Sequence, residues 1–83
     1  MTEHLNTKFN RRAVYRIEVE GKLDESWSEM FGGMAIQVEE KSKQNYITIL
    51  TGMIKDQAEL SGILNGLYNM HFSVLAVHCL DAK

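Results

Sequence analysis

Residues 56–69 have the sequence DQAELSGILNGLYN and carry the clearest structural signal in the chain. The large apolar residues recur at the three- and four-residue spacing of one helix face: Leu60, Ile63, Leu64 and Leu67. Asp56 is a good N-cap, and Glu59 three residues later completes a capping-box pair. We therefore expect an α-helix that ends where Asn69 takes the left-handed conformation.

Four segments around this helix have the composition of strands. They are residues 14–19, 34–39, 46–50 and 72–80, of which the first three alternate and the last is almost wholly apolar. The polar residues 40–45 suit a hairpin turn. We expect Gly52 to end the third strand or to mark a bulge in it.

A second, shorter helix is predicted over residues 23–33, where Asp24 or Ser26 can cap the first turn and the glycine pair 32–33 ends the last. Trp27 and Phe31 lie four residues apart, on one face of such a helix. Because two turns are marginal alone, both aromatic rings must hold the helix by burial. We expect Trp27 to be a core anchor; a ligand-stacking role is the alternative.

The order β-α-β-β-α-β predicts an α+β fold, the ferredoxin-like plait. It has a four-stranded antiparallel sheet in the order 4-1-3-2, with two helices on one face. The first crossover has roughly thirteen residues, 21–33, close to the minimum for such a connection. If it does not form, the first three strands make a meander.

The chain of 83 residues has six Gly, no Pro, one Cys and a net charge of −2. This composition excludes collagen-like and low-complexity proteins, and a single Cys makes no intramolecular disulfide. Residues 1–12 are polar and basic, so we expect a flexible N-terminal segment followed by one domain, residues 13–83. No apolar run is long enough to span a membrane and the start lacks a signal-peptide pattern, which predicts a cytoplasmic protein with no membrane partner.

Neither a metal centre nor a nucleophile is predicted. His78 and Cys79 are neighbours on a strand and point to opposite faces, and the apolar surroundings of Cys79 indicate a packing thiol. Asp24, Glu25 and Glu29 cluster at the start of a helix, where the helix dipole already stabilises acids. Catalysis by this cluster is kept as a third hypothesis behind two binding functions.

The glycines match no phosphate-binding motif, because the pair at 32–33 follows a helix instead of preceding one. The sheet face that would carry Tyr46 also carries Glu18, Gln37 and Glu39, which disfavours nucleic acid. We therefore expect no enzyme, no catalytic residue, no metal and no cofactor.

The last strand is expected at an edge of the sheet and is apolar on both sides, which invites pairing with another chain. If Ile47 and Ile49 point toward the helices, Tyr46, Thr48 and Leu50 face away from them. On the last strand, Leu75, Val77 and Cys79 would point inward. The residues expected on a homodimer interface, face to face or edge to edge, are Tyr46, Leu50, Val74, Ala76 and His78. The alternative is that Leu5 and Phe9 of the same chain cover this surface.

The outer side of the long helix carries small or uncharged residues: Ala58, Gly62, Asn65, Gly66 and Asn69. Gly62 and Gly66 each cost about 1 kcal/mol relative to Ala in an exposed helix. Either they are neutral drift, so that Ala stabilises the fold, or they form a docking stripe.

Three stretches carry a family resemblance: YRIEVEGKLD (15–24), WSEMFGGM (27–34), and Thr51-Gly52 followed by DQAELSGIL (56–64). They resemble a family of small bacterial proteins of uncharacterised function, most specifically in the Trp-Ser-x-x-Phe and Asp-Gln-Ala-x-Leu segments. The likeness covers most of residues 14–80 and brings no catalytic residues. Asn69-Met70-His71 stands where many relatives place a glycine, so the helix end is expected to differ.

A weaker likeness covers residues 47–80, which are similar to half of an ACT-type ligand-sensing domain. It implies a dimer that binds a small molecule near the strand-helix turn, at Gly52, Met53 and Asp56. We therefore expect a non-catalytic, homodimeric ligand-sensing or regulatory module. The alternative is a protein-interaction adaptor that uses the outer helix face or the Trp27 region.

Overall fold

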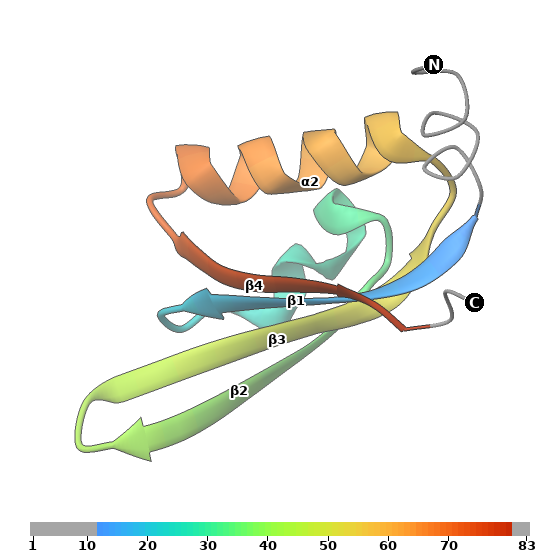
Figure 1. Ribbon diagram of the computed structural model, residues 1–83. Helices are drawn as coiled ribbons and strands as arrows, with labels where there is room; N and C mark the ends of the chain where they lie inside the picture. Colours follow the sequence, from blue (N-terminus) through green and yellow to red (C-terminus); the bar gives the residue numbers. More distant parts are fainter. Residues whose placement is uncertain (1–11, 81–83) are drawn as a thin grey trace.

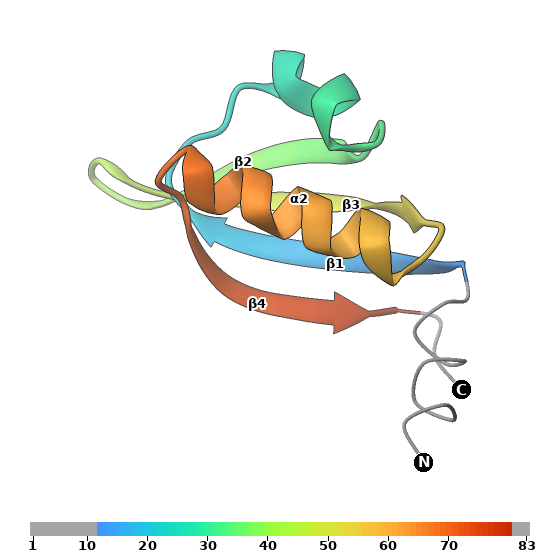
Figure 2. The same ribbon diagram turned by 90° about the horizontal axis from the view of Figure 1, so that it is seen from above.

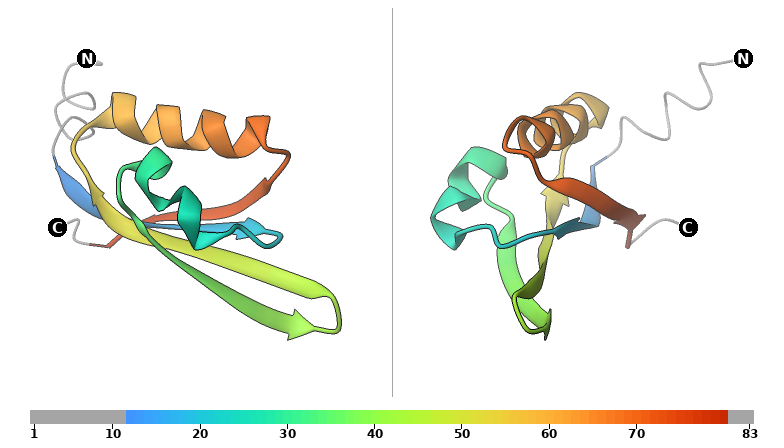
Figure 3. Two further views of the ribbon diagram at one scale, coloured as in Figure 1. Left: turned by 180° about the vertical axis from the view of Figure 1, so that it is seen from behind. Right: turned by 90° about the vertical axis from the view of Figure 1, so that its left-hand side faces the viewer.

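The computed structural model describes residues 12–80, which form a four-stranded antiparallel sheet with two helical segments, an α+β fold (Figure 1). The elements in chain order are strand β1 (Ala13–Glu20), 3-10 helix η1 (Glu25–Phe31), strands β2 (Ala35–Ser42) and β3 (Asn45–Ile54), helix α2 (Gln57–Asn69) and strand β4 (Ser73–Cys79). Both helical segments lie on the same side of the sheet (Figure 3). The opposite side, called the open face below, is covered by no element of residues 12–80.

The strands lie in the order β2-β3-β1-β4, which is the predicted order seen from the other edge. Since β1 and β2 both pair antiparallel with β3, the short first crossover forms and the meander does not. Both crossovers pass over the helix side and are right-handed, as parallel connections almost always are (Figure 2). The expected β-α-β-β-α-β order is not fully matched, because the first helical segment is a 3-10 helix.

The tighter winding of η1 changes what its aromatic residues do. Phe31 is buried, but Trp27 is 38% exposed, so the expectation that Trp27 anchors the core is wrong. In a 3-10 helix, residues four apart lie about 120° apart around the axis instead of sharing a face. Asp24, and not Ser26, caps this segment by accepting from the Ser26 amide at 3.2 Å. Gly32 ends it with φ 71°.

Helix α2 spans Gln57–Asn69, as predicted, but the left-handed residue after it comes two positions later than expected. Asp56 accepts from the Glu59 amide at 2.9 Å, and Glu59 accepts from the Lys55 amide at 2.8 Å. At the other end the left-handed residue is His71 (φ 69°), and Asn69 is still helical. The helix reaches this point because Leu67 stays in the core while its carbonyl accepts from the amide of Phe72, which closes the turn.

The core lies between the sheet and the two helical segments. β1 contributes Tyr15, Ile17 and Val19, as its alternation predicts. On β3, however, Thr48 and Leu50 are fully buried, so the prediction that Ile47 and Ile49 point toward the helices is wrong. Both faces of β3 carry apolar residues, so the apolar pattern alone does not reveal which face is buried. The buried face is the one that carries the polar residue Thr48.

Thr48 is buried because its hydroxyl binds the first crossover. It donates to the Gly21 carbonyl at 2.7 Å and accepts from the Leu23 amide at 3.0 Å. The Gly21 amide also donates to the Tyr46 carbonyl at 2.8 Å. Gly21 has φ 121°, and a side chain there would meet the Phe72 ring at 2.8 Å, so the chain can leave β1 at this angle only with glycine. These contacts fix the crossover where it passes over β3.

We expect Thr48→Val to destabilise the protein by about 2–3 kcal/mol, because the Gly21 carbonyl and the Leu23 amide lose their partner at unchanged side-chain volume. Thr48→Ser keeps the hydroxyl and loses one methyl group, which costs about 1 kcal/mol. Urea unfolding of both variants measures the difference. Equal losses would show that the hydroxyl does not hold the crossover.

Candidate functional site

None of the three residues expected to bind a small molecule lines either of the two hollows described below. Gly52 lies within β3 opposite Tyr15, and its Cα is so close to Met34 that a Cβ would lie 3.1 Å from the Met34 backbone. Pairing continues through it to Ile54, so Gly52 neither ends the strand nor marks a bulge. Met53 is half exposed, and Asp56 caps α2. Gly52 therefore serves packing and Asp56 serves the helix end.

Strand β4 is an edge strand, as predicted, and much of its apolar surface is exposed. Val77 is 40% exposed, while Leu75 and Leu80 are each 51% exposed. α2 contacts β3 and β4 but does not extend over the outer side of β4 (Figure 2). Cys79 is exposed for the same reason, which corrects the expectation of a buried packing thiol.

A register shift in β4 corrects the expected faces of this strand. Ala76 and His78 lie opposite Glu18 and Arg16 on the open face, as predicted. The shift then places Val74 opposite the buried Val19, and Val74 packs against the core. Val74 therefore does not belong to an interface on the open face. Leu75, which was expected to point inward, is 51% exposed.

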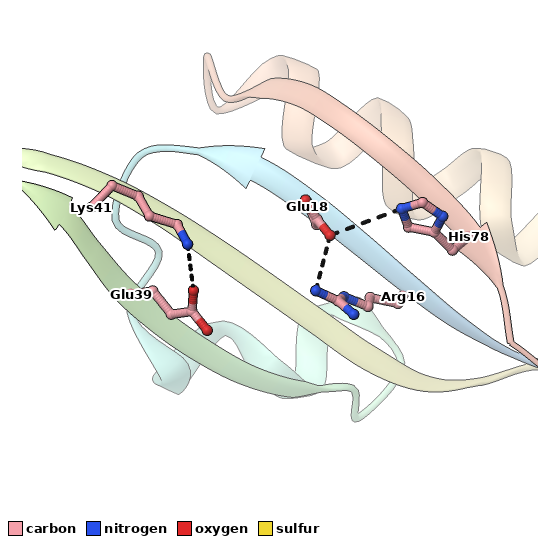
Figure 4. A network of polar contacts seen from close by, with 5 residues as sticks. All are labelled: Arg16, Glu18, Glu39, Lys41 and His78. Carbon is pink, nitrogen blue, oxygen red and sulfur yellow. Dashed lines mark ion pairs between the residues drawn. The ribbon is translucent and has the colours of Figure 1, made fainter.

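The open face is crossed by charged side chains (Figure 4). Glu18 lies 3.1 Å from the Arg16 guanidinium and 3.9 Å from His78 Nε2, and Lys41 lies 3.0 Å from Glu39. Tyr46 and Leu50 are absent from this face because of the corrected orientation of β3. Tyr46 instead lies under the Lys22 ammonium, 5.0 Å from its ring centroid.

On the helix side, a groove of about 520 Å³ lies between the first crossover and β2. Its walls combine apolar with charged side chains: Lys22, Leu23, Asp24, Glu25, Ile36 and Val38. Leu23 is buried, whereas Val38 is 36% exposed on the other edge strand of the sheet. The alternation of residues 34–39 places Ile36 and Val38 on one face. The groove also needs the path of the first crossover, and the alternation of residues along a strand does not specify that path.

A smaller hollow of about 270 Å³ lies at the far end of the sheet, where the β2–β3 hairpin extends beyond the other strands. Its walls come from all four strands: Glu20, Lys41, Asn45, Tyr46, Ile47 and Leu75. Exposed Leu75 forms one wall, so this hollow adjoins the β4 edge.

The two glycines of α2 differ. Gly62 is exposed with open space around it, but a Cβ on Gly66 would lie 2.9 Å from Phe31 Cε1. Gly66 therefore lets η1 approach α2 and does not belong to an outer stripe. The alternative in which Ala stabilises the helix is therefore kept for Gly62, and for Gly66 we expect a loss of stability instead.

Residues 12–80 contain no group of three or more potential metal ligands. Of the three acids considered for catalysis, Asp24 and Glu25 line the groove, while Glu29 lies exposed on η1. No helix among the described residues is long and apolar enough to cross a membrane. The expected cover by Leu5 and Phe9 falls outside the described residues.

A comparison with protein families matches residues 14–78 to Domain of unknown function (DUF8691). The chain belongs to this family. The matched range begins in β1 and ends in β4, so a DUF8691 domain includes all four strands, η1 and α2. No curated protein and no solved structure matches the chain.

The two helix glycines make a matched pair of substitutions. Gly62→Ala should stabilise the protein by about 0.5–1 kcal/mol through helix propensity. Gly66→Ala should destabilise it by about 1–3 kcal/mol, since the added Cβ would lie 2.9 Å from Cε1 of the buried Phe31 ring. Thermal unfolding of both variants gives the sign of each change. A stabilising Gly66→Ala would mean that η1 does not pack on α2 as described.

Proposed function

We propose that the protein is a non-catalytic binding module that acts as a homodimer, with two copies paired through their β4 edges. Its role would be ligand sensing or regulation, with each copy presenting its groove. The observation that carries this proposal is the difference between the two edges of the sheet. About half of Leu75 in β4 and about half of Leu80 just after it are exposed, and residues 12–80 place no strand beside the outer edge of β4.

The two edge strands differ in how well they resist self-association. β2 has Glu39, Glu40 and Lys41 in its second half, and charged residues and bulges are devices that keep edges from pairing. β4 has the sequence SVLAVHC, in which no Asp, Glu, Lys, Arg or Pro occurs. Its regular half, Ala76–Cys79, is free of the register shift, so it can add a strand of a second copy.

Edge-to-edge pairing is favoured over stacking of two open faces. Stacking would bury the cluster of Arg16, Glu18 and His78 together with the Glu39–Lys41 pair. Removing such charges from water costs more than their mutual attraction returns unless every group is satisfied. Pairing of β4 edges leaves these side chains in water and forms backbone hydrogen bonds instead.

The alternative function, an adaptor that docks through the outer face of α2, has less support. Gly66 faces Phe31, so the small residues left on that face are Ala58, Gly62, Asn65 and Asn69. Tyr68 at 60% exposure is the one large apolar residue of α2 that stands free of the core.

The proposal also includes a cytoplasmic location and a place among ferredoxin-like plaits. The strand order β2-β3-β1-β4 and the two crossovers on one face support the second point. This chain differs from that plait in its first helical segment, η1, which is a 3-10 helix instead of an α-helix.

The dimer is tested by sedimentation equilibrium at tens of micromolar. Wild-type protein should show twice the 9.5 kDa chain mass, whereas Val77→Lys should sediment as a folded monomer, because a Lys on an edge strand blocks pairing. Met30→Lys, at a residue 68% exposed on η1, is the matched control and should remain dimeric. A monomeric wild type, or a Val77→Lys protein that stays dimeric, contradicts the proposal.

A further inference from the structure

We propose that the homodimer binds one divalent transition-metal ion, with the preferences of Zn²⁺, between the His78 and Glu18 side chains of its two copies. The inference rests on the proposed pairing of β4 edges and adds a site that neither copy has alone. Its basis is the position of His78 on the open face of the edge strand, 3.9 Å from a carboxylate of the neighbouring strand (Figure 4).

The backbone of β4 determines how two such edges can pair. The Leu80 amide donates to the Val14 carbonyl at 2.8 Å. Along an antiparallel strand, successive residues direct their backbone groups to alternate sides. The amide and carbonyl of Val77, three positions before Leu80 and on the same side of the register shift, therefore point toward the outer edge. An antiparallel strand of a second copy can bond to them.

Symmetry then brings the two His78 side chains together. Antiparallel pairing of two identical edges forms one continuous sheet, with both open faces on the same side and a two-fold axis between the β4 strands. Directly opposite residues of such a pair point to the same face, so the axis must lie at a residue instead of between two residues. The registers that pair most of the regular half Ala76–Cys79 with itself have the axis at Val77 or at His78.

Either register leaves the two His78 side chains within reach of one ion. With the axis at His78 they are directly opposite, with Cβ atoms about 5 Å apart, and with the axis at Val77 they are diagonal neighbours, about 7–8 Å apart. Aromatic and long side chains still meet across such a diagonal. The His78 side chain is 53% exposed, so its ring can turn toward the axis.

Glu18 supplies the remaining donors. Its side chain is only 25% exposed, and one of its carboxylate oxygens lies 3.9 Å from His78 Nε2 of the same copy. Two copies thus bring two imidazoles and two carboxylates to one axis, a set that Zn²⁺ binds with four-coordinate geometry. A single copy has half of this set, and residues 12–80 contain no group of three potential metal ligands. The site is therefore incomplete without the second copy.

Arg16 limits the strength of the site. Its guanidinium lies 3.1 Å from the same Glu18 oxygen, and Arg16 lies opposite His78 in the register. The ion pair orients the carboxylate, but its positive charge also competes with a metal ion for Glu18. Replacing Arg16 with an uncharged residue should therefore strengthen metal binding.

Calorimetric titration of wild-type protein with ZnCl₂ in metal-free buffer tests the inference. We expect one Zn²⁺ per two chains. Saturating Zn²⁺ should tighten the dimer at least tenfold in sedimentation equilibrium, because the ion binds the paired form better than the single chain. The imidazole NMR signals of His78 should shift during the titration, whereas those of His71 should not.

Four variants, each checked for folding by circular dichroism, assign the ligands. His78→Ala should abolish the tightening by Zn²⁺ and leave the metal-free dimer intact. Glu18→Gln should weaken Zn²⁺ binding at least tenfold, and Arg16→Gln should strengthen it. His71→Asn is the matched control, because His71 is exposed at φ 69°, a conformation that Asn tolerates, and this variant should bind Zn²⁺ as the wild type does.

Three results overturn the inference: a dimeric wild type that binds no Zn²⁺, binding of one Zn²⁺ per chain, or a His78→Ala protein that binds Zn²⁺ as tightly as the wild type. Each of them leaves the proposed dimer unaffected. If wild-type protein is monomeric both with and without Zn²⁺, the dimer itself is wrong. The Val77→Lys variant should be monomeric and should bind Zn²⁺ at least tenfold more weakly than the wild type, since the site needs both copies.

Discussion

A hydroxyl buried on the central strand β3 determines how the first crossover leaves the sheet. Thr48 binds Gly21 and Leu23 at the same time, in a site from which water is excluded. Because a buried carbonyl or amide without a partner is costly, this geometry has few alternatives. The crossover then delivers the chain to β2 on the far side of β3, and the groove follows from its path.

The sequence was enough to predict the order of the elements, the strand order and the start of α2. The elements and the start of α2 depend on local periodicity and on the Asp56–Glu59 pair, whereas the strand order was expected from right-handed crossovers in two β-α-β halves. The orientation of β3 was not predictable in the same way, since both of its faces are apolar and the buried residue is a threonine whose partners lie 25 and 27 positions away. Trp27 was misplaced because a four-residue spacing indicates one face only if the helix is an α-helix.

The candidate site was predicted less well than the fold. The exposure of β4 follows from its composition and its position at an edge of the sheet. The expected site at Gly52 and Asp56 rested on a family likeness. In the structure Gly52 packs against Met34 and Asp56 caps α2. The groove involves residues from the crossover and from β2, so it exists only after the chain has folded. The two edges of one small sheet thus differ in chemistry: β4 is neutral and apolar, and β2 is acidic beside an apolar groove.

Hydrogen exchange of the Leu23 amide tests the central claim most directly. If the Thr48 hydroxyl holds the crossover, this amide exchanges only when the whole domain unfolds, with the same free energy of opening as the amides of Ile17 and Leu50 in the core strands. An exchange rate for Leu23 close to that of an unprotected loop amide would contradict the account, because the crossover would then open while the sheet stays intact.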